Sequence, residues 1–489
     1  MSDYLQWKSN VSLEKVFSSA ESFSYPVYFG RHIIYLTTLK KEKSRVALML
    51  KSDSGTHCIT PQPYSLRTKV NEYGGKSFWL FGDQLFFTNQ SDQCLYRQQL
   101  TESEGLVSVS EPVRITPKPV DDCIYMFTDV NLVSDKVVFA IVEQSNPLDS
   151  NVENNCFITK IDFSDSVEII APAEQGASFY SNLVYEPSSK SIAWVQWSHP
   201  SMPWDANDVF VAKLDGRSFS VKEKNKVPLK KTSSVCQLCF ASNGNLFLSA
   251  DFSTELEVND SSDFWNVYCY KLTTNELIQV TNESLEFGYP HWQYGDSRIV
   301  QLDDSNLLTI ASAPEGDQLF LISQNNLEVS VLSKTQSTIQ ALSSDESGRA
   351  LMIEFPKEAE AKLIEFMDRE FVDITKQVLN QIEGGQEAVS FDKKNVSIAH
   401  HFNFDCRDGE QAYGFYYPPC NESYELSDSA PPLIVMVHGG PTARAYGHYD
   451  IQKHFWTSRG FALFDVNHRG SSGYGRRCLL YTSPSPRDS

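Results

Sequence analysis

Residues 431–477 read PPLIVMVHGGPTARAYGHYDIQKHFWTSRGFALFDVNHRGSSGYGRR, and this stretch decides the fold of its part of the chain. Leu433–Val437 is an unbroken apolar run, which is typical of a strand buried on both faces of a parallel sheet. A segment of helical length follows, and Gly460 is placed to end it. Residues 461–466 predict a second buried strand. The order strand, loop, helix, strand therefore predicts a parallel pair joined by a helical crossover.

The turn after the first strand carries the sequence His438-Gly439-Gly440. Its two glycines allow backbone N–H groups to come close to a ligand. An HGG-type turn after a central strand is where α/β-hydrolases place one half of their oxyanion hole. Fixed backbone donors suit that task, since they need no reorganisation when charge develops on the substrate oxygen. A plain structural turn is the alternative interpretation of these three residues.

Three motifs in this stretch together resemble one family. HGGPT, a Gly-Phe-Ala strand and NHRGSSGYGR are similar to the start of the catalytic domain of the prolyl oligopeptidase family of serine peptidases. The most similar branch holds acylaminoacyl-peptidase and dipeptidyl-aminopeptidase-like enzymes. The resemblance implies that Gly440 is an oxyanion donor and that Gly439 shapes the turn. We expect His438 to brace the oxyanion turn and to be distinct from the triad histidine, and Arg469 to support loops near the active site.

The catalytic triad that the resemblance implies is missing from the sequence. In the family a G-x-S-x-G nucleophile elbow follows these motifs, and the aspartate and histidine come later. No G-x-S-x-G occurs in the 489 residues, and the run 470–473 is one residue too short for it. The final CLLYTSPSPRDS does not continue the family pattern and resembles translated adapter sequence. We therefore expect a C-terminally truncated chain, with residues 479–489 as a non-native tail.

Composition limits the classes of protein that this chain can belong to. A length of 489 residues predicts two or more domains, and 41% hydrophobic with 21% charged residues is typical of a globular protein. A formal net charge of −20 argues against nucleic acid and anionic membranes as partners. The N-terminus has no hydrophobic signal core, and the ten cysteines fit reduced thiols, so a cytoplasmic location is expected. Histidine and cysteine spacings predict no metal site, and no cofactor is expected.

A loose repeat runs through residues 25–384, where many short strands are separated by Gly, Asn, Asp and Ser. Its clearest copies read Ile-Thr-Pro, and its centres are residues 60, 116, 171, 232, 281, 333 and 375. Four-stranded propeller blades repeat at about 40–50 residues. The repeat predicts a β-propeller of seven blades. Residues 355–378 have a composition that also suits a helix, but the phase of the repeat favours two strands.

The predicted architecture is therefore a seven-bladed β-propeller plus an incomplete α/β-hydrolase domain. Residues 1–24 form a leading segment, which the resemblance implies packs on the hydrolase domain, and residues 25–384 form the propeller. Residues 385–478 form the N-terminal part of the hydrolase domain, in which 402–419 read as a hairpin.

One propeller motif carries candidate binding residues. LRTKVNEYGG, residues 66–75, resembles a motif of the same peptidase branch. Glu72 or Arg67 could bind a peptide terminus in the central cavity, or the two could form a structural ion pair between blades. Tryptophan and histidine residues in three further family-like stretches leave the same two options open, channel lining or packing between blades.

The sequence thus predicts a serine-type peptidase that acts on short peptides by acyl transfer in its full-length parent. The chain as given is expected to be inactive. A non-catalytic β-propeller binding module is the alternative from another class, and a lipase or esterase is a third option that the large propeller argues against. The sequence leaves open whether the parent removes dipeptides, acylated residues or post-proline segments. It also leaves open a homo-oligomeric state and the native C-terminal sequence.

Overall fold

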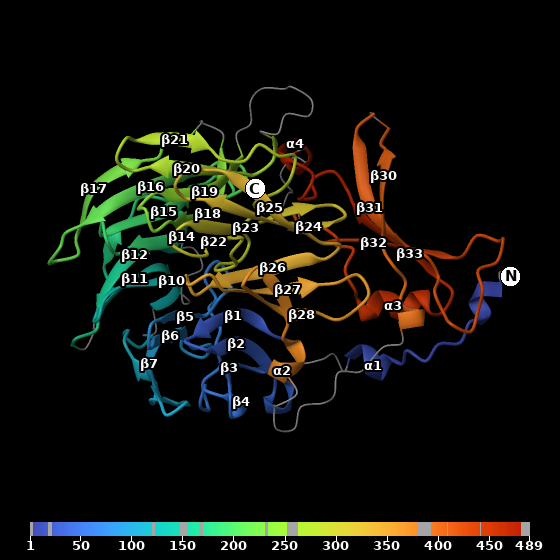
Figure 1. Ribbon diagram of the computed structural model, residues 1–489, viewed down its shortest axis with the longest axis horizontal. Helices are drawn as coiled ribbons and strands as arrows, with labels where there is room; N and C mark the ends of the chain where they lie inside the picture. Colours follow the sequence, from blue (N-terminus) through green and yellow to red (C-terminus); the bar gives the residue numbers. More distant parts are fainter. Residues whose placement is uncertain are drawn as a thin grey trace.

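The computed structural model describes residues 3–17, 22–119, 123–146, 154–165, 170–229, 233–251, 263–379, 393–407, 409–440 and 442–480 (Figure 1). The predicted end of the propeller near residue 384, the repeat centre at 232 and residues 481–489 lie outside these ranges. None of the helices in these ranges combines the length and the hydropathy of a membrane-spanning segment.

Seven antiparallel sheets follow one another along the described part of residues 24–373. The first has β1 (Ser24–Phe29), β2 (His32–Leu39), β3 (Arg45–Ser52) and β4 (Gly55–Cys58). The second has β5 (Phe78–Phe81), β6 (Gln84–Thr88), β7 (Leu95–Ser103), β8 (Leu106–Val109) and β9 (Val113–Arg114). The third has β10 (Ile124–Ser134), β11 (Val137–Ser145), β12 (Asn155–Asp162) and β13 (Pro172–Glu174). The fourth has β14 (Phe179–Glu186), β15 (Ser191–Trp197), β16 (Asp208–Leu214) and β17 (Val221–Lys226).

The remaining three sheets have the same four-strand order. The fifth has β18 (Ser234–Phe240), β19 (Leu246–Asp251), β20 (Asn266–Lys271) and β21 (Glu276–Gln279). The sixth has β22 (Ile299–Gln301), β23 (Asn306–Ala313), β24 (Gly316–Ser323) and β25 (Val329–Lys334). The seventh has β26 (Thr338–Ser344), β27 (Ala350–Phe355), β28 (Lys362–Met367) and β29 (Glu370–Asp373), so residues 355–378 hold strands before the short α2 (Thr375–Leu379).

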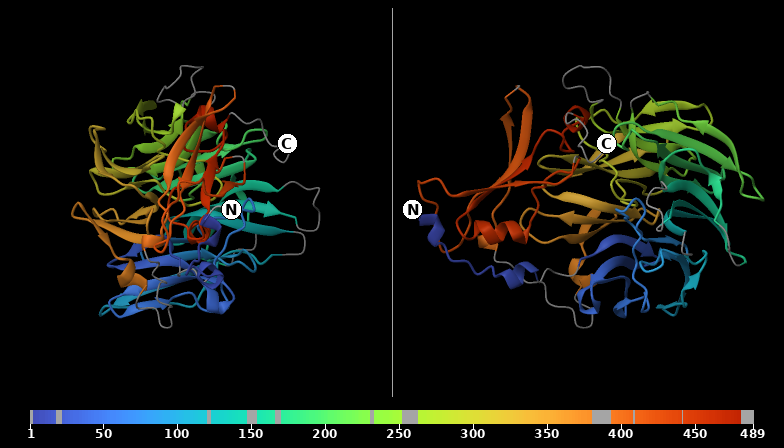
Figure 2. Two further views of the ribbon diagram at one scale, coloured as in Figure 1. Left: turned by 90° about the vertical axis from the view of Figure 1, so that its right-hand side faces the viewer. Right: turned by 180° about the vertical axis from the view of Figure 1, so that it is seen from behind.

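The seven sheets close into a ring (Figures 1 and 2). An apolar cluster fills the space between each sheet and the next, and one such cluster joins the seventh sheet to the first. In that closing cluster Tyr35 and Met49 of the first sheet lie with Leu351 and Leu363 of the seventh. A sheet of four short strands cannot bury both faces alone, so stacking around a ring stabilises it. This arrangement fits a β-propeller.

The threonine repeat has a structural cause. In four of the seven sheets the repeated threonine follows the outer strand, and its hydroxyl accepts a hydrogen bond of 2.8 to 3.0 Å from a backbone N–H of the third strand. These pairs are Thr60 with Leu48, Thr116 with Leu95, Thr281 with Val267, and Thr375 with Leu363. The threonine therefore satisfies a donor at the point where the outer strand leaves the ladder.

A second unit lies on one side of the ring (Figure 1). Its sheet has the order β30-β31-β33-β32, built from β30 (His400–Asp405), β31 (Gln411–Tyr417), β32 (Leu433–Val437) and β33 (Ala462–Asn467). β32 and β33 are parallel, and α3 (Ile451–Thr457) connects them, as the sequence predicts. The side chain of Asp450 begins α3 by accepting a hydrogen bond from Gln452 N–H. Short helices elsewhere are η1 (Asp3–Gln6), α1 (Leu13–Phe17), η2 (Lys40–Glu42), η4 (Lys393–Asn395) and α4 (Arg476–Leu479).

Residues 3–17 lie against this second unit (Figure 2). The Tyr4 hydroxyl donates to Ser427 O at 3.0 Å, and the Arg459 guanidinium donates to Val11 O at 2.8 Å. α1 contacts α3. The leading segment therefore contacts a part of the chain more than 400 residues away in sequence.

One face of the second sheet is bare, which corrects the prediction that Leu433–Val437 is buried on both faces. Ile434 and Met436 pack on the cluster that contains Phe415 and Leu463. The alternate residues Leu433, Val435 and Val437 are 55 to 63% exposed. β32 is also an edge strand, because it pairs only with β33 among the described strands. The expectation is wrong for this chain because no described segment covers that face.

Candidate functional site

A cavity of about 620 Å³ lies between the ring and the second unit. The ring contributes Tyr73, Tyr289, Trp292, Asp296 and Arg298 to its wall, among others. The second unit contributes Gly439, Gly440, Thr442, Arg444 and Ser472. A volume of this size is in the range of small-molecule and peptide-end sites. The turn that the sequence singled out thus opens onto a space shared by the two units.

Gly440 has a backbone conformation that favours glycine. Its φ is +79°, and a Cβ placed on it would meet no heavy atom within 4 Å. Among the described residues, none accepts a hydrogen bond from the Gly440 N–H. The ring also contacts the residue that follows this turn, because Trp292 Nε1 donates a hydrogen bond to Thr442 Oγ1 at 2.7 Å. Pro441, between them, lies outside the described residues.

His438 contacts a serine that the sequence motifs did not connect to it. His438 Nε2 lies 2.7 Å from Ser471 Oγ, and its ring stacks on His468 at 4.5 Å between centroids. Burial lowers the pKa of His438, so its imidazole is neutral near pH 7. Ser471 is completely buried and does not line the cavity, whereas its neighbour Ser472 does. The pair therefore links the ends of two neighbouring parallel strands, which supports a bracing role for His438.

This contact has a signal in the sequence that could have been used. Both residues follow the carboxyl ends of predicted parallel strands, and those ends meet at one edge of a sheet. Asp465 is not a third member of the pair, because its carboxylate forms an ion pair of 2.7 Å with Lys453.

The structure does not bring the other predicted site residues into the cavity wall. Glu72 and Arg67 are exposed, and the described residues contain no ion pair between them. Glu72 has a φ of +64° and precedes Tyr73, which does line the cavity. A role for Glu72 or Arg67 at a peptide terminus stays a prediction. Arg469 is half-buried in the loop after β33, away from the cavity wall.

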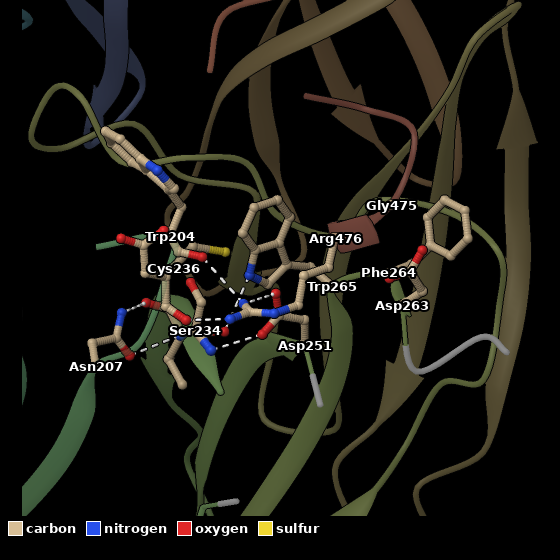
Figure 3. Close-up of polar contacts among 12 residues, drawn as sticks. Trp204, Asn207, Ser234, Cys236, Asp251, Asp263, Phe264, Trp265, Gly475 and Arg476 are labelled. Carbon is tan, nitrogen blue, oxygen red and sulfur yellow. Dashed lines mark hydrogen bonds and ion pairs between the residues drawn. The ribbon is translucent and has the colours of Figure 1, made fainter. Parts of the chain in front are cut away.

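A buried polar network fastens the end of the described chain to the ring (Figure 3). Arg476 points to Asp251 with Nη1 2.7 Å from Oδ2, and both side chains are 5% exposed or less. Arg476 also donates to the backbone carbonyls of Trp204 and Asp205. These residues come from three segments that are far apart in the sequence. Trp204 packs in one apolar cluster with Trp265. Trp292 packs against the same cluster and also lines the cavity.

Glu286 is a second buried carboxylate at this boundary. Its Oε1 accepts from Gly475 N–H at 3.0 Å and its Oε2 from Trp265 N–H at 3.2 Å, so it bonds both units. Burial raises the pKa of Glu286 to about 7, although these two hydrogen bonds act in the opposite direction. The folded protein therefore binds a proton here at a pH where the unfolded chain does not.

We expect a pH-dependent stability difference between the native chain and its Glu286→Gln variant. Because the folded pKa is raised, the stabilising effect of protonation is fully present below about pH 4.3 and is lost as pH rises through about 7. The free energy of unfolding of the native chain, relative to the variant, should rise by on the order of 2 kcal/mol from pH 8 to pH 5. Urea denaturation at both pH values measures it, and a difference that is constant with pH would contradict this role.

Comparisons with known proteins place this fold among peptidases. No family model matches the chain. Dipeptidyl peptidase family member 6 of Caenorhabditis elegans is 44% identical over 45 residues, which are 9% of this chain and 6% of that protein. The structure of a Mycobacterium tuberculosis puromycin-hydrolyzing peptidase superposes with a TM-score of 0.80 at 23% identity, over 96% of this chain and 70% of that one. A Pyrococcus horikoshii acylaminoacyl peptidase gives 0.61 at 16% identity, over 97% of this chain and 68% of that one.

The resemblance to the prolyl oligopeptidase family, drawn from the motifs in residues 438–476, is confirmed by these similarities. The matched stretch of sequence spans only a small part of the length of the curated relative. The fold of the two structures extends over nearly the whole described chain.

Proposed function

We propose that this chain comprises a seven-bladed β-propeller and the first part of the α/β-hydrolase domain of a cytoplasmic serine-type peptidase that acts on short peptides. The observation that carries the proposal is the position of the His438-Gly439-Gly440 turn on the wall of the 620 Å³ cavity. A propeller on the other side of that cavity restricts access to short or unfolded peptides. Peptidase chemistry in proteins of similar fold supports this assignment.

The proposed domains follow the predicted boundaries. Residues 25–384 form the propeller, residues 385–478 form the start of the hydrolase domain, and residues 1–24 form the leading segment, of which 3–17 contact the hydrolase unit while Phe23 and Ser24 lie with the ring. The seven closed sheets support the first assignment, and the parallel β32–β33 pair supports the second. Leu479 is buried with Trp204 and Trp265, so ordered packing reaches one residue into the segment proposed as a non-native tail.

The proposed chemistry is acyl transfer. A serine attacks the peptide carbonyl, a histidine moves its proton, and an aspartate orients the histidine. The Gly440 N–H, from which no described residue accepts a hydrogen bond, would donate to the oxyanion, and Gly439 would shape the turn. The triad would belong to native sequence that continues past residue 478. The bare face of Leu433, Val435 and Val437 and the open edge of β32 support this, since the central strands of such sheets are covered on both faces.

Reactivity toward a fluorophosphonate probe and a peptidyl-amide reporter tests the proposal. The 489-residue chain should show neither reaction. Ser471, beside His438, is buried and lies outside the cavity wall, and no described base hydrogen-bonds to Ser472 Oγ, which lines it. A chain carrying the native continuation of the hydrolase domain should label stoichiometrically and release the reporter amine.

Two results would overturn the proposal. Labelling of the 489-residue chain that is lost in Ser471→Ala or Ser472→Ala would place the nucleophile in the present chain. An extended chain that binds peptides but neither labels nor cleaves would favour the alternative, a non-catalytic propeller binding module.

A further inference from the structure

Two arginines face the cavity from opposite units. Arg298 precedes β22 in the ring, and Arg444 lies in the loop between β32 and α3. Both reach the same hydroxyl, because Ser312 Oγ lies 2.8 Å from Arg298 Nη2 and 3.2 Å from Arg444 Nη2. Two guanidinium groups, one from each unit, therefore converge on one hydroxyl at the boundary between the units.

Neither guanidinium has a carboxylate partner within ion-pair distance among the described residues. Arg298 is only 4% exposed, and no described residue accepts a hydrogen bond from its Nε. A buried cation without a paired anion is costly, so such groups are normally matched by an acid. A guanidinium presents several donors in a fixed plane, and its best partner is a carboxylate that accepts two of them.

The nearby carboxylates accept hydrogen bonds from other groups, mostly backbone N–H groups, and form no ion pair with either arginine among the described residues. Asp296, on the same wall, accepts from the Tyr289 hydroxyl at 2.6 Å and from the N–H groups of Ser297 and Ala341 at 3.0 and 2.9 Å. Asp317 accepts from Ile339 N–H at 2.7 Å. Glu286 holds the N–H groups of Gly475 and Trp265. The free donor capacity of the two arginines is therefore available to a ligand.

We infer that this cavity selects peptides that carry a carboxylate, which Arg298 and Arg444 bind from the two sides. The carboxylate belongs to the free C-terminus of a short peptide or to an aspartate or glutamate side chain. The inference rests on the proposed function for the peptide nature of the ligand. It adds the charge preference, and it assigns the two arginines as specificity-determining residues shared by the propeller and the hydrolase unit.

Calorimetric titration of the 489-residue chain tests the inference without requiring catalysis. One pair of probes is acetyl-Ala-Ala-Phe as the free acid and as the C-terminal amide. The other pair is acetyl-Ala-Asp-Ala-amide and acetyl-Ala-Asn-Ala-amide. At least one acid should bind about 10-fold or more tightly than its neutral counterpart, and higher salt should reduce the difference. The pair that shows the preference identifies the source of the carboxylate.

Variants locate the preference on the two arginines. Arg298→Gln and Arg444→Gln should each weaken acid binding by about 10-fold and leave binding of the neutral peptide within about 2-fold. Arg298→Lys keeps the charge but not the planar fork, so it should retain part of the preference. Arg217→Gln, on an exposed turn of the propeller, is the matched control and should change neither affinity.

Each outcome decides between the alternatives. Equal affinity for acid and amide in both pairs, or no measurable binding of any probe, overturns the inference even if the extended chain proves to be a peptidase. A preference that survives in both glutamine variants also overturns it. If Arg298→Gln fails to fold, Arg444→Gln and the native acid–amide comparison still decide the point. If the 489-residue chain prefers acids but the extended chain has no peptidase activity, the inference is supported and the proposed function is rejected.

Discussion

Replacing Asp251 by alanine should destabilise the protein by about 3–5 kcal/mol, because it leaves the buried guanidinium of Arg476 without its counter-ion. The two groups lie 2.7 Å apart, and Asp251 is 1% exposed. Asp251 Oδ1 also accepts from Ser234 N–H at 2.7 Å, so the variant leaves a buried backbone donor without its partner. Burial raises the pKa of Asp251 to about 6, so the measurement belongs at about pH 7.5, where the carboxylate is ionised. Urea denaturation followed by tryptophan fluorescence measures the loss.

A matched exposed pair is the control for this effect. Lys226 and Asp208 also lie 2.7 Å apart, but their side chains are 53% and 45% exposed. Asp208→Ala should change the free energy of unfolding by less than about 1 kcal/mol. The double variant Asp251→Ala with Arg476→Met should recover part of the loss, since it removes the unpaired charge. Equal losses in Asp251→Ala and Asp208→Ala would show that burial does not govern this pair.

Replacing Gly440 by alanine in the extended enzyme should lower kcat by on the order of 10² to 10³, the effect of losing one oxyanion donor. A Cβ at this position has room, since nothing lies within 4 Å of it. The φ of +79° is strained for alanine, so the turn should relax and move the Gly440 N–H away from the substrate oxygen. Because the donor acts mainly on the transition state, KM should change much less than kcat.

Gly244 offers a control with the same local geometry. It has the same φ of +79° and the same open surroundings, but it lies in a hairpin turn of the fifth sheet. Gly244→Ala should therefore carry a similar backbone cost and leave kcat unchanged. A full-rate Gly440→Ala enzyme, or equal losses of kcat in both variants, would remove Gly440 from the proposed oxyanion hole.

The predictable parts of this protein are those with a local physical signal. The apolar runs at 433–437 and 461–466 and the helical length between them were enough to predict the parallel β32–β33 pair. The threonine repeat predicted the succession of sheets, because each hydroxyl serves the same backbone donor in its own sheet. Short polar turns and strand periodicity depend on residues within about 50 positions of one another, so they can be recognised in a single sequence.

The candidate site could be predicted only in part. The His-Gly-Gly motif pointed to a turn that does line the cavity, whereas Glu72 and Arg67 had a motif but lie outside its wall. Arg298 and Arg444 had no sequence signal. Their importance comes from burial and from a shared hydroxyl on Ser312, and neither property can be seen before the two units meet.

The sequence by itself determined the elements, their order and the residues of the glycine turn. Only the tertiary structure decided the pairings across the chain, such as Arg476 with Asp251 and His438 with Ser471. It also decided that one face of β32 is bare. The physical reason is that propensity and periodicity act between neighbours in the chain. The free energy of a buried charge or an exposed apolar face depends instead on which distant segments fill the space around it.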